Sequence, residues 1–352
     1  MKIGVPKEIK NHEYRVGLSP ASAKELIAHG HQITVEAGAA AGIGLSDDAY
    51  KDMGVKIANS AEAIFAENDM IIKVKEPQPI ECKQLNKGQL LFTYLHLAPD
   101  PKQTAALLES GVTAVAYETV TGPNNSLPLL APMSEVAGRL SAQAGAHCLE
   151  RAQGGSGVLM GGVPGTQPAD VFVIGGGVVG HNAAYIAKGM GANVTIVDSS
   201  IPRLRELDVE FSGRVNCLYA TKESIESHCA SADLVIGAVL VTGAKAPHVI
   251  SEEMVKGMEP GSVIADISVD QGGCVETTRP TTWAEPTFTE HGVVHFSVTN
   301  MPGAVPRTST QAISAAILPY VQRLAQPDWA SVPSLQKGIN VHSGKIVHPA
   351  LL

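Results

Sequence analysis

The sequence has 352 residues, 44% of them hydrophobic, and a formal net charge of −8. This length predicts two domains, and the excess of acidic residues excludes a basic surface for nucleic acid or for an anionic membrane. The five cysteines are scattered without metal-ligand or redox spacing, so we expect reduced thiols and no metal. We also expect a cytoplasmic protein, because the first residues lack the apolar segment of a signal peptide and no apolar stretch is long enough to span a membrane.

Residues 1–131 alternate strand and helix patterns, which predicts a mostly parallel sheet flanked by helices. Ser19-Pro20 has the pattern of a helix start, and Gly30 that of its end. The predicted strands cover residues 2–5, 32–36, 70–74, 89–95 and 113–117. Two further helices are predicted over residues 60–67 and 101–110.

A second α/β array follows a long predicted helix over residues 132–151. Its strands are predicted at residues 171–174, 194–197, 214–219, 234–236, 262–265 and 293–297. A second long helix, over residues 308–325, returns the chain to the first domain. We therefore expect an α/β protein with a first domain at 1–131, a second at 132–304 and a return segment at 305–352. The pattern of residues 326–352 is mixed and leaves their role open.

The strongest motif is a glycine-rich turn between two apolar segments. Gly175, Gly177 and Gly180 form a GxGxxG pattern, and Asp198 ends the next predicted strand. The first glycine permits a tight turn, the second lets a pyrophosphate approach the backbone, and the third lets helix and strand pack closely. The helix N-terminus attracts phosphate, and the acid accepts hydrogen bonds from a ribose. The second domain is therefore predicted to be a Rossmann fold that binds NAD, since a 2′-phosphate would meet the like charge of Asp198.

Polar residues at predicted strand ends indicate a substrate site, because ligands of open parallel sheets lie beyond the carboxyl ends of strands. Arg15 follows the first strand, Lys75 and His96 directly follow two others, and Asp270 follows a strand of the second domain. Such residues suit hydride transfer to a small α-keto or α-imino acid. Arg15 binds a carboxylate with its fork, Lys75 holds the keto oxygen or the carboxylate, His96 carries a proton, and Asp270 orients water or ammonia.

Each of these residues also has a purely structural interpretation. Arg15 could pair with Glu8 or Glu13 at the surface. Lys75 could be a solvated strand end, His96 a hydrogen-bonded core residue and Asp270 part of a turn. Residue type and spacing leave these alternatives open.

Seven segments of the sequence resemble those of alanine dehydrogenases, over nearly the whole chain. They are residues 4–18, 74–77, 92–97, 132–139, 233–238, 266–273 and 300–302. The resemblance implies NAD-dependent, reversible oxidative deamination of L-alanine to pyruvate and ammonium. It also implies a homohexamer of two-domain subunits, with the substrate domain built from both chain ends.

The resemblance assigns roles to individual residues. Arg15 and Lys75 would bind substrate, and His96 and Asp270 would be the catalytic pair. The implied cofactor contacts are Ser134, Val178, Val179, Asp198, Arg203, Val239, Leu240, Ile267, Ser268, Val269, Asp270, Arg279, Val298, Thr299, Asn300 and Met301. The chain departs from the family pattern at Ala220, where many relatives carry serine near the adenine, and it ends soon after His348.

Two other functions share this architecture. One is the NAD-binding soluble subunit of a proton-translocating transhydrogenase, which hands on hydride and needs no set of Arg15, Lys75 and His96. The other is a catalytically silent NAD-binding redox sensor. Turnover with pyruvate, ammonium and NADH separates an enzyme from both.

Overall fold

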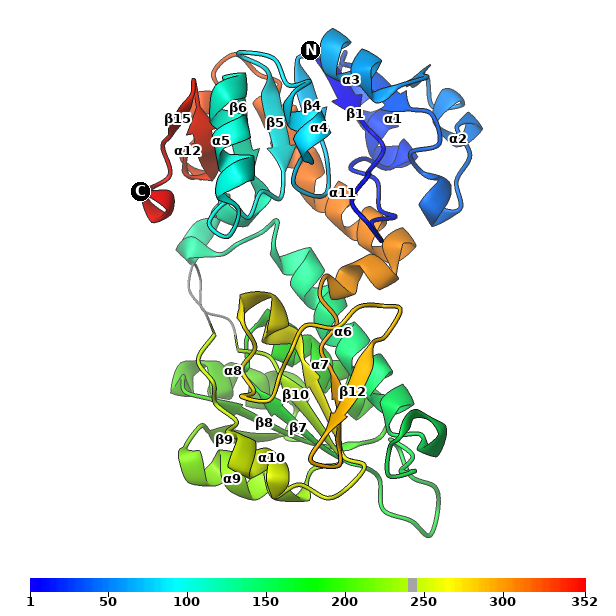
Figure 1. The fold of residues 1–352 in the computed structure, drawn as a ribbon, viewed down its shortest axis with the longest axis vertical. Coiled ribbons are helices and arrows are strands. Elements are labelled where there is room, and N and C mark those ends of the chain that lie inside the picture. Colours follow the sequence, from blue (N-terminus) through cyan, green and yellow to red (C-terminus); the bar gives the residue numbers. More distant parts are fainter. Residues whose placement is uncertain (240–245) are drawn as a thin grey trace. The chain divides into compact units, whose positions relative to one another are not determined.

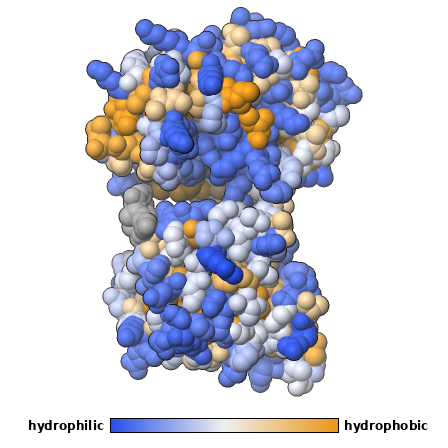
Figure 2. All heavy atoms as spheres, in the orientation of Figure 1, coloured by the Kyte–Doolittle hydropathy of each residue, from blue (hydrophilic) through white to orange (hydrophobic). Residues whose placement is uncertain are grey.

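The structure is a computed structural model that describes residues 1–239 and 246–352. The chain forms two compact units (Figure 1). Unit 1 comprises Met1–Met133 and Val305–Leu352, and unit 2 comprises Ser134–Ala304. The visible surfaces are mainly hydrophilic with interspersed hydrophobic residues (Figure 2). Among the described residues, no helix is long and apolar enough to cross a membrane.

Unit 1 is built on an eight-stranded sheet in the order β15-β14-β6-β5-β4-β1-β2-β3. Strands β1 to β6 pair in parallel, whereas β14 and β15 are antiparallel additions at the β6 edge. The strands are β1 (Lys2–Val5), β2 (Gln32–Glu36), β3 (Lys56–Ala58), β4 (Met70–Ile72), β5 (Leu90–Thr93), β6 (Thr113–Ala116), β14 (Ile339–His342) and β15 (Lys345–Ile346). The segment 326–352, whose role the sequence left open, therefore contributes two strands to this sheet.

Helices cover both faces of this sheet. The helices of unit 1 are α1 (Pro20–Ala28), α2 (Asp48–Lys51), α3 (Ala61–Glu67), α4 (Pro79–Cys82), α5 (Pro101–Ser110), α11 (Pro306–Leu324) and α12 (Pro333–Gly338). One core cluster joins α3, α4 and α5 to the sheet through Phe65, Cys82 and Leu107. Helix α1 begins as predicted, since the Ser19 hydroxyl accepts a hydrogen bond from the Ser22 N–H and proline follows.

Unit 2 is built on a seven-stranded sheet in the order β12-β13-β11-β10-β7-β8-β9. All its pairs are parallel except β12 with β13. The strands are β7 (Asp170–Ile174), β8 (Asn193–Asp198), β9 (Asn216–Tyr219), β10 (Leu234–Gly237), β11 (Val263–Asp266), β12 (Thr287–Glu290) and β13 (Val293–Phe296). Numbered from β7, the six parallel strands, which exclude β12, have the order 3-2-1-4-5-6 of the Rossmann fold, as predicted.

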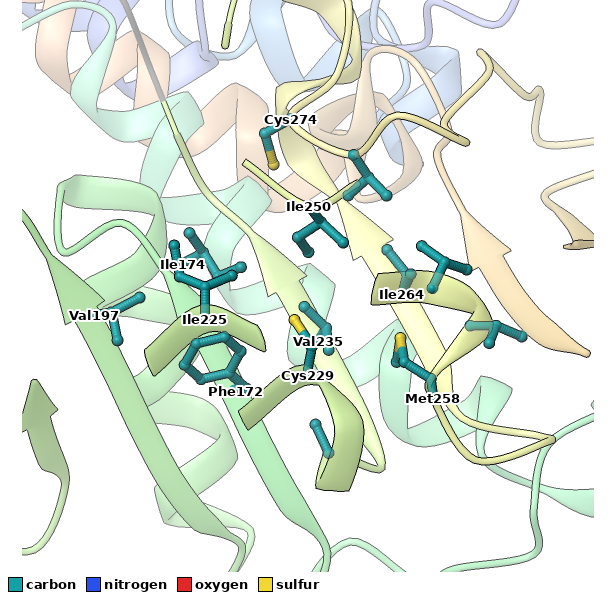
Figure 3. Packing of buried hydrophobic residues seen from close by; sticks show 14 of the residues in the cluster. Phe172, Ile174, Val197, Ile225, Cys229, Val235, Ile250, Met258, Ile264 and Cys274 are labelled. Atoms are coloured by element: carbon teal, nitrogen blue, oxygen red, sulfur yellow. The ribbon is translucent and has the colours of Figure 1, made fainter. Parts of the chain in front are cut away.

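Helices also cover both faces of the second sheet. They are α6 (Ala131–Cys148), which begins in unit 1, and α7 (Val178–Gly189), α8 (Ile201–Phe211), α9 (Lys222–Ser231) and α10 (Glu252–Lys256). Figure 3 shows Ile225 and Cys229 of α9 against Phe172 of β7 and Val235 of β10, in one continuous apolar cluster. A Cβ on Gly145 of α6 would lie 2.5 Å from Leu234, so α6 packs closely on the opposite face.

The two sheets share one strand order. In unit 1, β1 lies between β2 and β4. The chain therefore adds β2 and β3 on one side of β1, and it then crosses to the other side to add β4. In unit 2, β7 is flanked by β8 and β10 in the same way. Each sheet therefore has a topological switch point, which is where open α/β sheets bind ligands.

Candidate functional site

The glycine-rich turn lies at the switch point of unit 2 and has the predicted geometry. Gly175 has φ +101°, and a Cβ there would lie 2.6 Å from the carbonyl oxygen of Ala238, at the end of β10. A Cβ on Gly180 would lie 1.8 Å from the carbonyl oxygen of Gly175, so only glycine lets α7 approach its strand. A Cβ on Gly177 would meet no atom within 4 Å, which leaves that side of the turn open to a ligand.

The first turn of α7 offers its N–H groups to such a ligand. Gly177 is the N-cap and provides no side-chain hydrogen bond to them. Unpaired N–H groups and the positive end of the helix dipole favour a phosphate. The turn, the open side and the adjacent acid together fit the pyrophosphate and ribose of a dinucleotide.

Asp198 lies at the end of β8, beside the glycine turn. Its Oδ2 accepts a hydrogen bond from the Gly176 N–H at 2.7 Å, and its Oδ1 accepts one from the Ser200 N–H at 2.7 Å. Arg203 donates from Nε to the Gly176 carbonyl oxygen at 2.7 Å. Asp198 and Arg203 thus brace the turn as well as lining it, which the motif by itself did not indicate.

Most other predicted cofactor residues also follow the carboxyl ends of parallel strands. Val239 follows β10, the segment Ile267–Gln271 is a 3-10 turn after β11, and residues 298–301 follow β13. The Ser268 hydroxyl donates to the Val239 carbonyl oxygen at 2.7 Å and so ties two of these ends together. Ser134 lies on α6, and the Arg279 guanidinium stacks 4.2 Å from the ring centre of Phe288. Leu240 lies outside the described residues.

Asp266 and Asp270 have different surroundings. Asp266 is fully buried at the end of β11, and its carboxylate accepts hydrogen bonds from the N–H groups of Ser268 and Cys274. Asp270, four residues later, is exposed in the 3-10 turn. Asp266 therefore supports the loop, whereas Asp270 is an exposed turn residue, as its structural interpretation predicted. The catalytic role of Asp270 stays a prediction.

Arg15 and Lys75 follow β1 and β4, the two strands that flank the switch point of unit 1. Strand β4 ends at Ile72, so Lys75 lies three residues beyond it and not directly after it. Glu8 links the two segments, because its carboxylate accepts hydrogen bonds from the N–H groups of Val74 (2.6 Å) and Lys75 (3.4 Å) and its charge acts on Arg15. The other oxygen of Glu8 pairs with Lys73, which is fully buried.

Arg15 is paired with Glu13, but not at the surface. Its side chain is only 2% exposed, and Nε and Nη2 donate to the two Glu13 oxygens at 2.7 and 2.6 Å. Nη1 donates to Met133 Sδ at 3.2 Å. Burial opposes the charged guanidinium, yet the hydrogen bonds and charge of Glu13 outweigh it and hold the pKa of Arg15 above its ordinary value. The interpretation as a surface ion pair is therefore wrong, and one edge of the fork is occupied by Glu13.

Strand β5, the neighbour of β4 in the sheet, ends at Thr93, so His96 lies three residues beyond it and not directly after it. Its side chain is 48% exposed, which excludes the core-histidine interpretation. The imidazole stacks on the ring of Tyr94 at 5.9 Å and 9°, and Tyr94 is buried with its hydroxyl donating to the Leu129 carbonyl oxygen at 2.6 Å. Glu118, which follows β6, accepts a hydrogen bond from the His96 N–H at 2.7 Å.

Sequence reasoning missed the acids that hold these residues. The sequence suggests Glu8 and Glu13 only as surface partners of Arg15, and it marks Glu118 only by its place directly after the predicted strand at residues 113–117. The one signal for them was position, since each lies near a strand end of the same sheet. Among the described residues no group of acids, histidines and cysteines is arranged to hold a metal.

Comparison with known proteins agrees with this geometry. The family model described as the alanine dehydrogenase/PNT N-terminal domain matches residues 4–137, and the corresponding C-terminal model matches residues 141–349. The chain is 53% identical to the alanine dehydrogenase of Halomonas elongata, covering 100% of this chain and 96% of that one. It is 49% identical to the alanine dehydrogenase of Methanococcus maripaludis, covering 100% and 95%.

Two solved structures have the same fold. An L-alanine dehydrogenase superposes with a TM-score of 0.97 at 51% identity, covering 100% of this chain and 98% of that one. A transhydrogenase from Sinorhizobium meliloti superposes with a TM-score of 0.86 at 24% identity, covering 99% and 100%. The second likeness shows a common fold only.

Proposed function

Because this chain belongs to the alanine dehydrogenase/PNT family, we propose that it catalyses the NAD-dependent, reversible oxidative deamination of L-alanine to pyruvate and ammonium. One observation carries the proposal. Both sheets place their candidate residues at a switch point, with Arg15 and Lys75 beyond β1 and β4 and the glycine turn beyond β7. A substrate carboxylate and a dinucleotide each have a fitting set of groups.

Unit 1 has the groups to bind and orient the substrate. Arg15 is held rigidly by Glu13, so the guanidinium can meet a carboxylate without losing side-chain freedom. Lys75 is half-buried and provides a second cation. Its backbone N–H donates to the Glu8 carboxylate, which fixes the position of the residue. Together they neutralise and orient a small amino or keto acid.

The proton transfers are assigned to His96 and Asp270. Bound in unit 2, NAD would supply the acceptor for the Cα hydrogen and its electron pair, and the substrate would then carry a C=N bond. Water then adds to that carbon through its oxygen, the new hydroxyl loses its proton to solvent as the C=O bond forms, and the C–N bond breaks as ammonia leaves. His96 takes the proton from water and returns one to the nitrogen, and Asp270, exposed in its turn, orients the water.

The assembly and location belong to the same proposal. We propose a homohexamer from the family likeness. Large hydrophobic side chains that unit 2 leaves exposed support self-association; they are Leu159, Val163, Tyr185 and Met190. A cytoplasmic location is supported by the five free cysteines. Light scattering on a sizing column measures the subunit number.

The decisive experiment is a turnover assay that follows NADH absorbance. We expect NADH oxidation only when pyruvate and ammonium are both present, and NAD reduction with L-alanine. Binding of NADH without turnover in either direction would contradict the proposal and favour a docking module of the transhydrogenase type.

A further inference from the structure

Glu118 connects the end of β6 to the segment that carries His96. It lies in the 3-10 turn Tyr117–Thr119, directly after β6. Its Oε1 accepts hydrogen bonds from two successive backbone N–H groups, that of Leu95 at 3.1 Å and that of His96 at 2.7 Å. Hydrogen bonds to a carboxylate are stronger than those between neutral groups, so this is a firm attachment.

His96 has a backbone conformation that needs such an attachment. Its φ is +48°, in the left-handed region that non-glycine residues rarely adopt because it is strained. Leu95 and Leu97 on either side are buried, whereas the imidazole between them is exposed. The left-handed residue is therefore what turns this one side chain out of the core.

We propose that Glu118 is a positioning residue for the reaction, and this rests on the proposed function of His96. By accepting both N–H groups it stabilises the left-handed conformation and so aims the imidazole. The Tyr94 ring, which lies nearly parallel to the imidazole, is a second contact that limits its orientation. Oε1 lies 2.7 Å from the backbone nitrogen of His96 and 4.0 Å from its Nδ1, so the carboxylate accepts its hydrogen bond from the backbone and not from the ring.

Two variants of Glu118 distinguish the role of its hydrogen-bond-accepting oxygen from the role of its negative charge. Glu118→Ala removes the acceptor, and we expect kcat to fall by roughly 10- to 100-fold, since small misplacements of a reacting group are costly. The KM for pyruvate and the Kd for NADH should stay near the parent values. Glu118→Gln keeps a carbonyl oxygen that accepts the two N–H groups, and it should restore most of kcat. Glu67→Ala, an exposed acid on α3, is the matched control and should behave as the parent.

A crystal structure of Glu118→Ala gives a readout that does not depend on turnover. We expect His96 to leave the left-handed region, or its segment to become disordered, while thermal unfolding shows a folded protein. An unchanged φ at His96, a parent-like kcat in Glu118→Ala, or a Glu118→Gln protein as slow as Glu118→Ala would each overturn the proposal. If the parent protein itself shows no turnover, the proposed function fails, and the φ measurement still tests the attachment.

Discussion

The guanidinium of Arg15 and the carboxylate of Glu13 form a buried, two-point hydrogen-bonded pair, with distances of 2.7 and 2.6 Å. Breaking one side of a buried pair leaves an uncompensated charge, which is strongly destabilising. The pair therefore couples the stability of unit 1 to the orientation of Arg15, the cation that we propose binds the substrate carboxylate.

Replacing Arg15 with lysine should raise the KM for pyruvate and lower the melting temperature together. An ammonium cannot reproduce the two parallel hydrogen bonds to Glu13, so both orientation and pairing suffer. Steady-state kinetics and thermal unfolding measure the two effects. Arg205→Lys, at an exposed position on α8, is the control. A lysine variant with the parent KM would show that Arg15 has only a structural role.

Replacing His96 with alanine should lower kcat by about 10²–10⁴-fold and leave the Kd for NADH nearly unchanged. The imidazole is half-exposed, so its loss should move the melting temperature little. Stopped-flow turnover, NADH titration and calorimetry test this. The exposed His147→Ala variant controls for loss of an imidazole. If His96→Ala loses stability but keeps its turnover per folded molecule, the catalytic role is wrong.

The double variant Asp198→Gly with Ile201→Arg should weaken NAD binding and admit NADP. The carboxylate repels a 2′-phosphate, and the new arginine attracts it. Because Asp198 also accepts N–H groups of Gly176 and Ser200, the glycine turn should loosen and NAD affinity should fall further. Titration with both cofactors measures the ratio of the two affinities. Ile201→Arg alone should keep the NAD preference, and an unchanged ratio in the double variant would remove Asp198 from the ribose site.

Gly180→Ala should destabilise unit 2 by about 1–3 kcal/mol and weaken NAD binding, because α7 must move away from the turn. The added Cβ would otherwise lie 1.8 Å from the Gly175 oxygen. Gly189→Ala on the same helix is the matched control, since a Cβ there meets nothing within 4 Å and should be neutral or stabilising by up to about 1 kcal/mol. Denaturant unfolding measures both. Equal stabilities for the two variants would contradict the close approach.

Because of His295, we expect the free energy of unfolding to fall in mild acid. It is fully buried on β13, with Nδ1 near the Val293 carbonyl oxygen and Nε2 near the Thr277 hydroxyl. Burial lowers its pKa below the ordinary value of 6.5, so the unfolded chain takes up the proton first. This contribution to stability is complete above pH 6.5 and declines as the pH falls through 6.5 and then through the lower pKa of the folded state.

Melting temperatures across this range check the effect of His295. The His295→Asn variant should depend less on pH than the parent between neutrality and mild acid. His147→Gln, at an exposed position, should retain the parent's dependence. A His295→Asn protein with the parent slope would show that other groups set the acid response.

The sequence predicted those elements whose local residue pattern reflects their burial or their turn geometry. Buried parallel strands such as β7 and β10 are continuous apolar segments. The glycine turn is recognisable because the tight turn, the phosphate contact and the helix packing each require a glycine at a set position. Strand-end position also led to the prediction of Lys75 and His96 as site residues, and that prediction awaits the variants described above. Short strands were missed, because β3 and β12 have few buried residues and no strong alternation.

The contacts that depend on distant segments could not be predicted. Glu118 meets His96 only because β5 and β6 are neighbours, and Glu8 meets Val74 only because β1 and β4 are. Likewise, nothing in the local pattern of Arg15 tells a buried pair from an exposed one. Pairing across a sheet is set by topology, and topology requires the whole chain.

The completion of the first sheet by β14 has a consequence for synthesis on the ribosome. Strand β6 has its outer edge covered only when residues 339–342 have emerged, and the Val16 N–H finds its acceptor, the Thr310 hydroxyl, nearly as late. Unit 2 is one continuous segment that lies wholly before these residues. Unit 2 can therefore fold while the edge of β6, earlier in the nascent chain, is still unpaired. An unpaired strand edge can pair with a strand of another molecule. The order of translation thus makes unit 1, whose first residues are synthesised earliest, the last unit to complete its fold. A chaperone that covers the edge of β6 would act between the synthesis of β6 and that of β14.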